Sequence, residues 1–253
     1  MDLQLSGRRA LVTGGTRGIG RAIVEAFVDE GTTVGFCARD AAEIAETEGT
    51  LAGRAGSASG AVVDVADGPA LKAWVGEAAA SMGGVDILVH NVSALAIGAD
   101  EENWKASYEV DLMGLVRMVD AAMPHLEASD AGVILGISSV SGREVDFAAG
   151  PYGTMKAALI HYVQGLAYQL APRGIRANTV SPGNTFFEGG VWDQIRTGNP
   201  ELYETALGLN PTGRMGTPEE MARATVFLAS PASSFTSGTN LVVDGALTRG
   251  VQL

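Results

Sequence analysis

The sequence has a single cysteine, Cys37, among 253 residues, so a disulfide framework is excluded. No apolar run approaches the roughly 18 residues that a membrane-spanning helix needs. Basic residues are scarce, since 17 lysines and arginines face 29 acidic residues, and the net charge of −12 disfavours nucleic acids and anionic membranes as partners. The first residues lack a basic stretch followed by an apolar one, so we expect no signal peptide and favour a cytoplasmic location.

The chain has only three histidines. His90, His125 and His161 show no metal-ligand spacing, so no metal site is expected. Small and apolar residues are abundant: 46% of the chain is hydrophobic and 34 residues are glycine. This composition is ample for one well-buried core with many tight turns. Neither a repeat nor a proline- or serine-rich linker divides the chain, so residues 1–253 are predicted to form a single domain.

Short apolar runs alternate with segments of helical periodicity, which predicts an α/β fold with a doubly wound parallel sheet and helices on both faces. Residues 50–60 are small and glycine-rich and are interpreted as a surface loop. The seven expected strands lie near 8–13, 32–37, 60–64, 85–90, 132–137, 175–180 and 240–244. The expected helices lie near 18–30, 40–49, 67–82, 103–128, 151–171 and 217–229.

A glycine-rich turn joins the first expected strand to the first expected helix. Gly14, Gly18 and Gly20 follow the apolar run 10–12, and apolar residues recur at helical spacing from Ile19 onward. Glycines let a backbone approach a phosphate closely, and a helix N-terminus supplies unpaired N–H groups and positive potential. The turn therefore indicates a dinucleotide site, although an α/β turn without a ligand has the same flanking elements.

Tyr152 and Lys156 are four residues apart, so in a helix their side chains share one face. The chain has only three lysines and five tyrosines, which makes this spacing unlikely to arise by chance. A free phenol has a pKa of about 10, and a nearby ammonium favours the phenolate and makes the hydroxyl a better acid and base. The alternative is an ordinary exposed helix pair.

Residues 13–20, Ser139, the Tyr152/Lys156 pair and Pro182-Gly183 together resemble the short-chain dehydrogenase/reductase family in order and spacing. The resemblance runs from about residue 3 to residue 245. It implies a single Rossmann-like domain with a nicotinamide coenzyme and carbonyl/alcohol chemistry. It also implies a homotetramer built through the helices at 103–128 and 151–171, and a substrate lid at 188–210 where the alternation breaks.

The same resemblance assigns catalytic roles. Tyr152 exchanges a proton with the substrate oxygen, Lys156 stabilises the phenolate and binds the nicotinamide ribose, and Ser139 orients the substrate. Ser138 is the neighbouring candidate, but on an extended segment its side chain points the other way. Asp111 stands where the family carries an asparagine that holds a water in a proton relay. Because a carboxylate only accepts hydrogen bonds, Asp111 either holds that water, pairs with Lys156, or is structural.

Coenzyme choice depends on the end of the second strand, where relatives that prefer NAD carry an aspartate and this chain has Ala38. Arg39 and Arg17 suit a 2′-phosphate, so NADP(H) is favoured over NAD(H). Asp40 either neutralises Arg39 or binds the ribose itself. The expected coenzyme-binding residues are Gly14, Thr16, Arg17, Gly18, Ile19, Gly20, Arg39, Asp64, Val65, Asn91, Tyr152, Lys156, Pro182, Gly183 and Thr185.

Two segments depart from the family pattern. Residues 90–93 read His-Asn-Val-Ser where the family has Asn-Asn-Ala-Gly, and Phe187 stands where relatives often carry a threonine. Several apolar residues predict either an apolar substrate pocket or core packing, namely Leu95, Val145, Phe147, Phe186, Phe187 and Trp192.

The sequence thus predicts an NADP(H)-dependent oxidoreductase that interconverts a ketone and a secondary alcohol on an apolar small molecule. An acyl-carrier-linked 3-oxoacyl reductase is one alternative, which the net charge of −12 disfavours because the carrier is itself acidic. The other is a nucleotide-sensing binding protein with weak or no catalysis. The departures at His90 and Asp111 leave it open, while the Ser139/Tyr152/Lys156 set argues against it.

Overall fold

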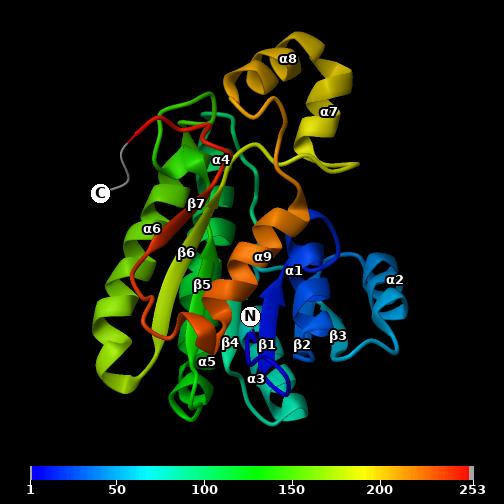
Figure 1. Ribbon diagram of the computed structural model, residues 1–253, viewed down its shortest axis with the longest axis vertical. Coiled ribbons are helices and arrows are strands. Elements are labelled where there is room, and N and C mark those ends of the chain that lie inside the picture. Colours follow the sequence, from blue (N-terminus) through cyan, green and yellow to red (C-terminus); the bar gives the residue numbers. More distant parts are fainter. Residues whose placement is uncertain (1, 251–253) are drawn as a thin grey trace.

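The computed structural model describes residues 2–250, and its seven strands form one sheet in the order β3-β2-β1-β4-β5-β6-β7 with every pair parallel (Figure 1). This confirms the predicted doubly wound α/β fold. The strands are β1 Arg9–Thr13, β2 Thr33–Ala38, β3 Ser57–Val62, β4 Ile87–His90, β5 Val133–Ile137, β6 Arg176–Pro182 and β7 Asn240–Val243.

The helices cover both faces of the sheet (Figure 1). They are α1 Gly18–Asp29, α2 Ala41–Leu51, α3 Gly68–Met82, α4 Glu101–Ser107, α5 Gly114–Glu127, α6 Pro151–Leu170, α7 Val191–Gly198, α8 Pro200–Leu209 and α9 Pro218–Ala229. A π-helical turn, η1, spans Tyr108–Met113, and short 3-10 turns lie at η2 Val140–Gly142, η3 Ala171–Arg173 and η4 Pro231–Ser233. In residues 2–250 no helix is both long enough and apolar enough to cross a bilayer.

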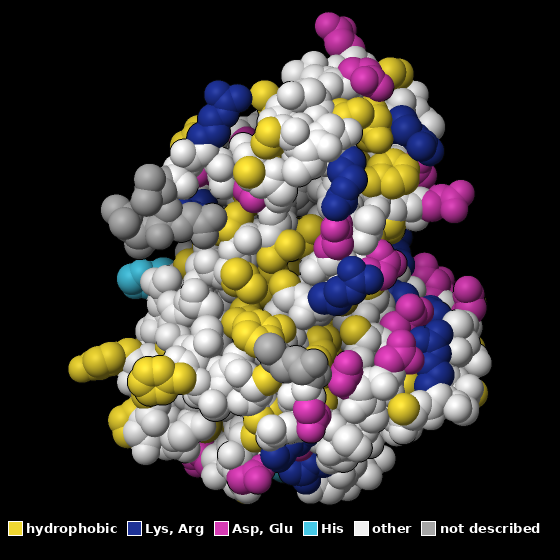
Figure 2. Space-filling model, in the orientation of Figure 1, with side chains coloured by type: hydrophobic (Ala, Val, Ile, Leu, Met, Phe, Trp, Pro, Cys, Tyr) yellow, Lys and Arg dark blue, Asp and Glu magenta, His cyan; other side chains and the backbone are white. Residues whose placement is uncertain are grey.

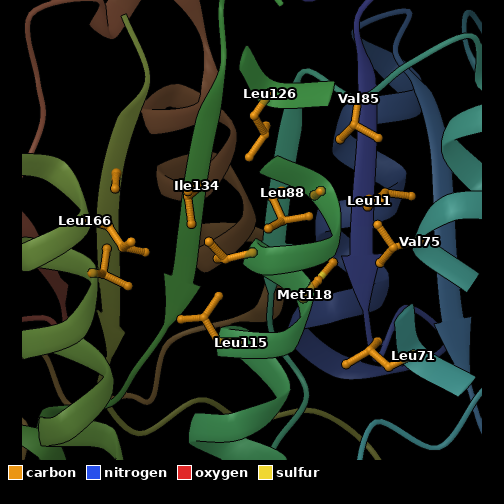
Figure 3. Packing of buried hydrophobic residues seen from close by; sticks show 14 of the residues in the cluster. Leu11, Leu71, Val75, Val85, Leu88, Leu115, Met118, Leu126, Ile134 and Leu166 are labelled. Carbon is orange, nitrogen blue, oxygen red and sulfur yellow. The ribbon is translucent and has the colours of Figure 1, made fainter. Parts of the chain in front are cut away.

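Two hydrophobic cores hold the helices to the sheet. On one face Leu115 and Met118 of α5 pack with Leu71 of α3 against strand residues such as Leu88 and Ile134 (Figure 3). The second core joins α1 and α9 to the opposite face. The inner strands are apolar on both faces, as parallel strands covered by helices must be. Each fully buried leucine or isoleucine stabilises the fold by about 1.5–3 kcal/mol. The two cores therefore hold the strands, and with them the strand ends, in fixed positions.

The helical segment expected near 103–128 is present as Glu101–Glu127, but it is wrong in part as a single α-helix, because the π-helical turn η1 separates α4 from α5. The turn ends at a close tertiary contact: a Cβ atom at Gly114 would lie 2.5 Å from Val65 Cγ1 and 2.9 Å from His90 Cε1. The backbone of Gly114 therefore touches the neighbouring strand ends. The wider turn that precedes it carries Asp111 inward, where its side chain is fully buried. Such turns are frequent at functional sites.

The surface loop expected at 50–60 is also wrong in part, since β3 begins at Ser57 and pairs with β2 along its whole length. Its small residues conceal a strand from periodicity arguments. Gly60 explains one of them: a Cβ atom there would lie 2.4 Å from Ile44 Cγ2 and 2.7 Å from Phe36 Cζ. Glycine lowers the β propensity of this strand, but its lack of a side chain permits the close contact with Ile44 and Phe36.

The functional edge of the sheet is set by the neighbours β1 and β4, which pair although β2 and β3 lie between them in sequence. In an open α/β sheet, ligands bind outside the carboxyl ends of the strands at this kind of switch point. Residues 188–210 form α7 and α8, which stand together at one end of the molecule (Figure 1). Trp192 of α7 and Ala206 of α8 form a small third core with Met215, which follows the insert.

Candidate active site

Tyr152 and Lys156 lie in the first two turns of α6, and the structure brings their side chains together. The Lys156 ammonium is 5.6 Å from the centroid of the Tyr152 ring. Only 2% of the lysine side chain is exposed, and Nζ donates a hydrogen bond to the Ile137 carbonyl at 3.0 Å. A buried ammonium beside a phenol, held by the end of β5, is the arrangement that the four-residue spacing predicts.

Asp111 is the direct partner of this lysine. Its Oδ1 lies 3.0 Å from Lys156 Nζ, and its Oδ2 accepts a hydrogen bond from the Ala94 N–H at 3.2 Å. The carboxylate is completely buried, so it depends on these two contacts. Of the roles left open for Asp111, the structure contains the pairing with Lys156. The pair ties the loop after β4 to helix α6.

The two neighbouring serines point in different directions. Ser138 is buried, and its hydroxyl donates to the Lys156 carbonyl at 2.9 Å. The Ser139 hydroxyl accepts a hydrogen bond from the Ser141 N–H at 3.1 Å, and no described residue accepts its own hydrogen. Ser139 therefore keeps an uncommitted hydroxyl hydrogen, whereas Ser138 braces the helix that carries Lys156.

His90 is a fully buried residue near Lys156 and Asp111 that the sequence analysis did not include among the site residues. Burial, and then the positive charge of Lys156, lower the pKa of His90 to about 4, so the imidazole is neutral around pH 7. Its Nδ1 lies 3.4 Å from Thr13 Oγ1, and the negative charge of Asp111, followed by the backbone of Asp111 and Val110, opposes the lowering of that pKa. The ring thus lies between the end of β1 and the π-helical turn. The departure from the family pattern at position 90 was the available signal.

The glycine turn admits no side chain at its centre. A Cβ atom at Gly20 would lie 2.0 Å from the Gly14 carbonyl oxygen and 2.3 Å from Asn91 Nδ2. Asn91 donates from Nδ2 to the carbonyls of Thr13 and Gly14 at 3.1 and 3.2 Å, so this side chain braces the turn. Arg17 precedes α1 without capping it, which leaves the first N–H groups of the helix open to an anion. The turn is thus tightly packed, and the helix that follows it begins with uncapped N–H groups.

Two exposed guanidinium groups lie at the ends of the glycine turn and β2. Neither Arg17 nor Arg39 forms a salt bridge with any residue in the range 2–250. Asp40 does not neutralise Arg39, because its Oδ1 accepts from the N–H groups of Ala42 and Glu43 as the N-cap of α2.

The remaining expected coenzyme contacts occupy the other strand ends. Val65 is buried after β3, and Asp64 accepts a hydrogen bond from the Ala66 N–H. After β6, the Thr185 hydroxyl donates to the Gly183 carbonyl at 3.1 Å. Ile19 lies partly buried against the core beneath α1. Because all strands are parallel, the segments that follow β3 and β6 lie at the same carboxyl edge of the sheet as the glycine turn after β1.

Phe187 connects the glycine turn to the insert. A Cβ atom at Gly18 would lie 2.5 Å from Phe187 Cζ, and one at Gly190 would lie 2.8 Å from the same atom. The tip of the ring is thus held between two glycines, one at the start of α1 and one just before α7. Nothing in the sequence pattern indicates this contact.

The other aromatic residues divide between packing and exposure. Trp192 is 7% exposed and meets the rings of Phe147 and Tyr203 edge-on, at centroid distances of 5.9 and 6.5 Å. Phe186 packs on Tyr203 and under the Arg196 guanidinium. Phe147 is 54% exposed, and Val145 and Leu95 are exposed as well. The insert therefore contacts the loop before α6 through Phe147. Among residues 2–250 no cluster of three metal-ligating side chains exists.

Comparisons with known proteins agree with this geometry. A family model described as Enoyl-(Acyl carrier protein) reductase matches residues 14–248. The isoepoxydon dehydrogenase patN of Penicillium expansum is 41% identical over 254 residues, covering 98% of this chain and 97% of that protein. The 3-oxoacyl-(acyl-carrier-protein) reductase FabG of Thermotoga maritima is 34% identical, covering 97% of this chain and 99% of that protein.

Two solved structures of oxidoreductases are similar to this chain over nearly its whole length. L-sorbose reductase from Gluconobacter frateurii, complexed with NADPH and L-sorbose, has a TM-score of 0.89 at 28% identity and covers 99% of this chain and 100% of that chain. A short chain dehydrogenase from Burkholderia cenocepacia in complex with NADP has a TM-score of 0.86 at 29% identity, covering 96% and 99%.

Fold, site and relatives together define an NAD(P)-dependent oxidoreductase that acts on CH–OH and C=O groups. Its chemistry is the interconversion of a carbonyl compound and an alcohol. The chain belongs to the short-chain dehydrogenase/reductase family.

Proposed function

We propose that the protein uses NADP(H) to interconvert a ketone and a secondary alcohol on an apolar small molecule. The observation that carries this proposal is the buried Lys156 ammonium beside the Tyr152 ring, in a chain whose glycine turn leads into a helix with uncapped first N–H groups. When bound, the nicotinamide coenzyme supplies or accepts the hydride. The residues of the chain manage the proton and the geometry.

In the reductive direction Tyr152 donates a proton to the oxygen that becomes an alkoxide, and in the oxidative direction it removes that proton. The Lys156 ammonium stabilises the phenolate that Tyr152 forms. Ser139 donates its hydroxyl hydrogen to the substrate oxygen and holds it against Tyr152. Asp111 keeps the ammonium in place from below, through the 3.0 Å contact between Oδ1 and Nζ.

The preference for NADP(H) is supported by the two exposed guanidinium groups, Arg17 and Arg39, which have no carboxylate partner in residues 2–250. The role of Asp40 as N-cap of α2 supports it further, because this carboxylate is engaged with backbone N–H groups. The structural neighbours described with NADPH and NADP are consistent with this choice.

An apolar substrate is supported by the exposed Leu95, Val145 and Phe147 on the loops beside the insert. We propose residues 188–210 as the lid that covers it, since α7 contacts the loop before α6 through Trp192 and Phe147. A substrate tethered to an acidic carrier protein is disfavoured by the net charge of −12. The buried Asp111–Lys156 pair beside Tyr152 argues against a binding protein without catalysis.

We also propose that the protein assembles as a homotetramer through α5 and α6. A groove of about 1080 Å³ runs between α3, α5 and α6 and exposes Met113, Val116 and Met123 beside Tyr162. A groove of this size with an apolar floor suits the complementary surface of a second copy.

Replacing Tyr152 with Phe tests the function directly. Turnover of a ketone panel with NADPH is expected to fall by at least about 100-fold, because the proton donor is lost, while the affinity for NADPH remains within a few-fold. Tyr168→Phe is the matched control, since Tyr168 is a highly exposed tyrosine on the same helix. Undiminished turnover of Tyr152→Phe would remove the proposed role.

A further inference from the structure

Glu43, in the first turn of α2, holds a residue of the glycine turn. Its Oε2 accepts a hydrogen bond from the Thr16 hydroxyl at 2.7 Å. The Glu43 N–H donates to Asp40, and the Glu43 carbonyl accepts from the Thr47 hydroxyl at 2.7 Å. The Thr47 hydroxyl in turn accepts from Arg21. The carboxylate therefore sits on a fixed backbone and is braced against α1.

The contact decides what Thr16 offers to a ligand. A hydroxyl carries one hydrogen and two acceptor lone pairs, and the hydrogen of Thr16 is committed to Glu43. Toward the nucleotide side of the turn, Thr16 is then an acceptor only. A ribose hydroxyl donates a hydrogen bond to such a group, whereas an ionised phosphate has only acceptor oxygens. Thr16 thus matches a 2′-hydroxyl and mismatches a 2′-phosphate.

The negative charge of Glu43 also disfavours a 2′-phosphate. A 2′-phosphate carries about −1.5 to −2 charges near pH 7, so a nearby carboxylate repels it while Arg17 and Arg39 attract it. Basic and acidic side chains are interspersed on the side of the molecule that carries α1 and α2 (Figure 2). The surroundings of the glycine turn therefore contain both signs of charge. Arg17 and Arg39 favour a 2′-phosphate, and Glu43 opposes it.

We propose that Glu43 is a specificity-determining residue which, through its hold on Thr16, limits the preference for NADP(H) over NAD(H). The inference rests on the proposed function and extends it, because the arginine pair alone would produce a stronger preference. Glu43 leaves the affinity for NAD(H) unchanged, since Thr16 accepts from a ribose hydroxyl whether or not its hydrogen is committed. The protein thereby retains the use of both coenzymes.

Two variants separate the two effects. Glu43→Gln removes the charge but keeps a carbonyl oxygen that accepts from Thr16, and it is nearly isosteric, so it is expected to fold. Glu43→Ala removes the charge and also frees the hydroxyl hydrogen for a phosphate oxygen. Glu46→Ala is the control, because Glu46 is an exposed glutamate one turn further along α2. Circular dichroism verifies that each variant is folded.

The measurement is the dissociation constant of NADPH and of NADH, followed by the fluorescence of the reduced nicotinamide. Glu43→Ala is expected to bind NADPH about tenfold more tightly, as one charge-assisted hydrogen bond would provide, with NADH changed less than about twofold. Glu43→Gln is expected to fall between Glu43→Ala and the unaltered protein. An unchanged ratio of the two constants, or a shift toward NADH, would overturn the inference. If the unaltered protein binds neither coenzyme, the proposed function itself fails, and the inference with it.

Discussion

Substituting Gly20 with alanine tests whether the glycine turn is as tightly closed as the structure indicates. The new Cβ atom would lie 2.0 Å from the Gly14 carbonyl oxygen, and real Cβ atoms essentially never approach closer than 3.0 Å. The obstructing group is backbone, so the turn itself must move by about an ångström. The same Cβ atom would lie 2.3 Å from Asn91 Nδ2 and would displace the amide that braces the turn.

The cost follows from these contacts. Overpacking a closed site costs about 1–3 kcal/mol, and each of the two Asn91 hydrogen bonds contributes about 0.5–1.5 kcal/mol. A total of about 3 kcal/mol lowers the Tm of a chain of this size by roughly 6–12 °C. Affinity for the coenzyme is expected to fall as well, because the first N–H groups of α1 move with the turn.

Thermal unfolding followed by circular dichroism, with and without NADPH, measures both effects. Gly76→Ala is the matched control, because Gly76 is an exposed glycine inside α3 with no atom within 4 Å of a Cβ atom. Alanine at that helical position is expected to stabilise the protein by about 0.5–1 kcal/mol. If Gly20→Ala unfolds at the same temperature as the unaltered protein, or behaves like Gly76→Ala, the turn is looser than its geometry implies and the reasoning is refuted.

Two further predictions concern single charged residues. Arg39→Ala is expected to weaken NADPH binding about tenfold or more and to leave NADH binding nearly unchanged; equal losses for both coenzymes in fluorescence titrations would contradict a 2′-phosphate contact. Burial opposes ionisation of Asp86, but hydrogen bonds from Arg9 and Ser129 outweigh it and lower the pKa of this carboxyl. The depressed pKa stabilises the fold above the unfolded value of about 4, and the gain is lost as the pH falls through the folded value. Urea unfolding should therefore find Asp86→Asn about 2 kcal/mol less stable at pH 7, with the difference shrinking below pH 4; a difference independent of pH would reject this linkage.

The sequence predicted the features that local pattern controls. Apolar runs such as the one at residues 10–12 fixed the strands, because strands covered on both faces must be continuously apolar. The spacing of Tyr152 and Lys156 predicted a contact because a helix turn brings residues four apart together. The glycine turn was recognisable because glycine at Gly14 and Gly18 allows a positive φ, which is +70° and +54° in the structure.

The features that escaped prediction depend on residues distant in the sequence. The π-helical turn at 108–113 adjoins Gly114, which packs closely against Val65 and His90 from two other segments. The hydrogen bond between Glu43 and Thr16 joins two helix starts that are 27 positions apart. Strand β3 was partly predicted as a loop because small, glycine-containing segments are typical of loops. In the structure, Gly60 allows close contact with Phe36 of the neighbouring strand. None of these contacts leaves a periodic trace in the sequence.

Phe187 links the start of α1 to the segment that leads into α7. The tip of its ring touches Gly18 at the nucleotide end and Gly190 where α7 begins, so neither segment shifts without disturbing the other. A substitution that displaces α7 is therefore transmitted to the glycine turn through this ring. A side chain larger than hydrogen at either glycine would meet the Phe187 ring, so the start of α1 and the start of α7 are mechanically coupled through one aromatic side chain.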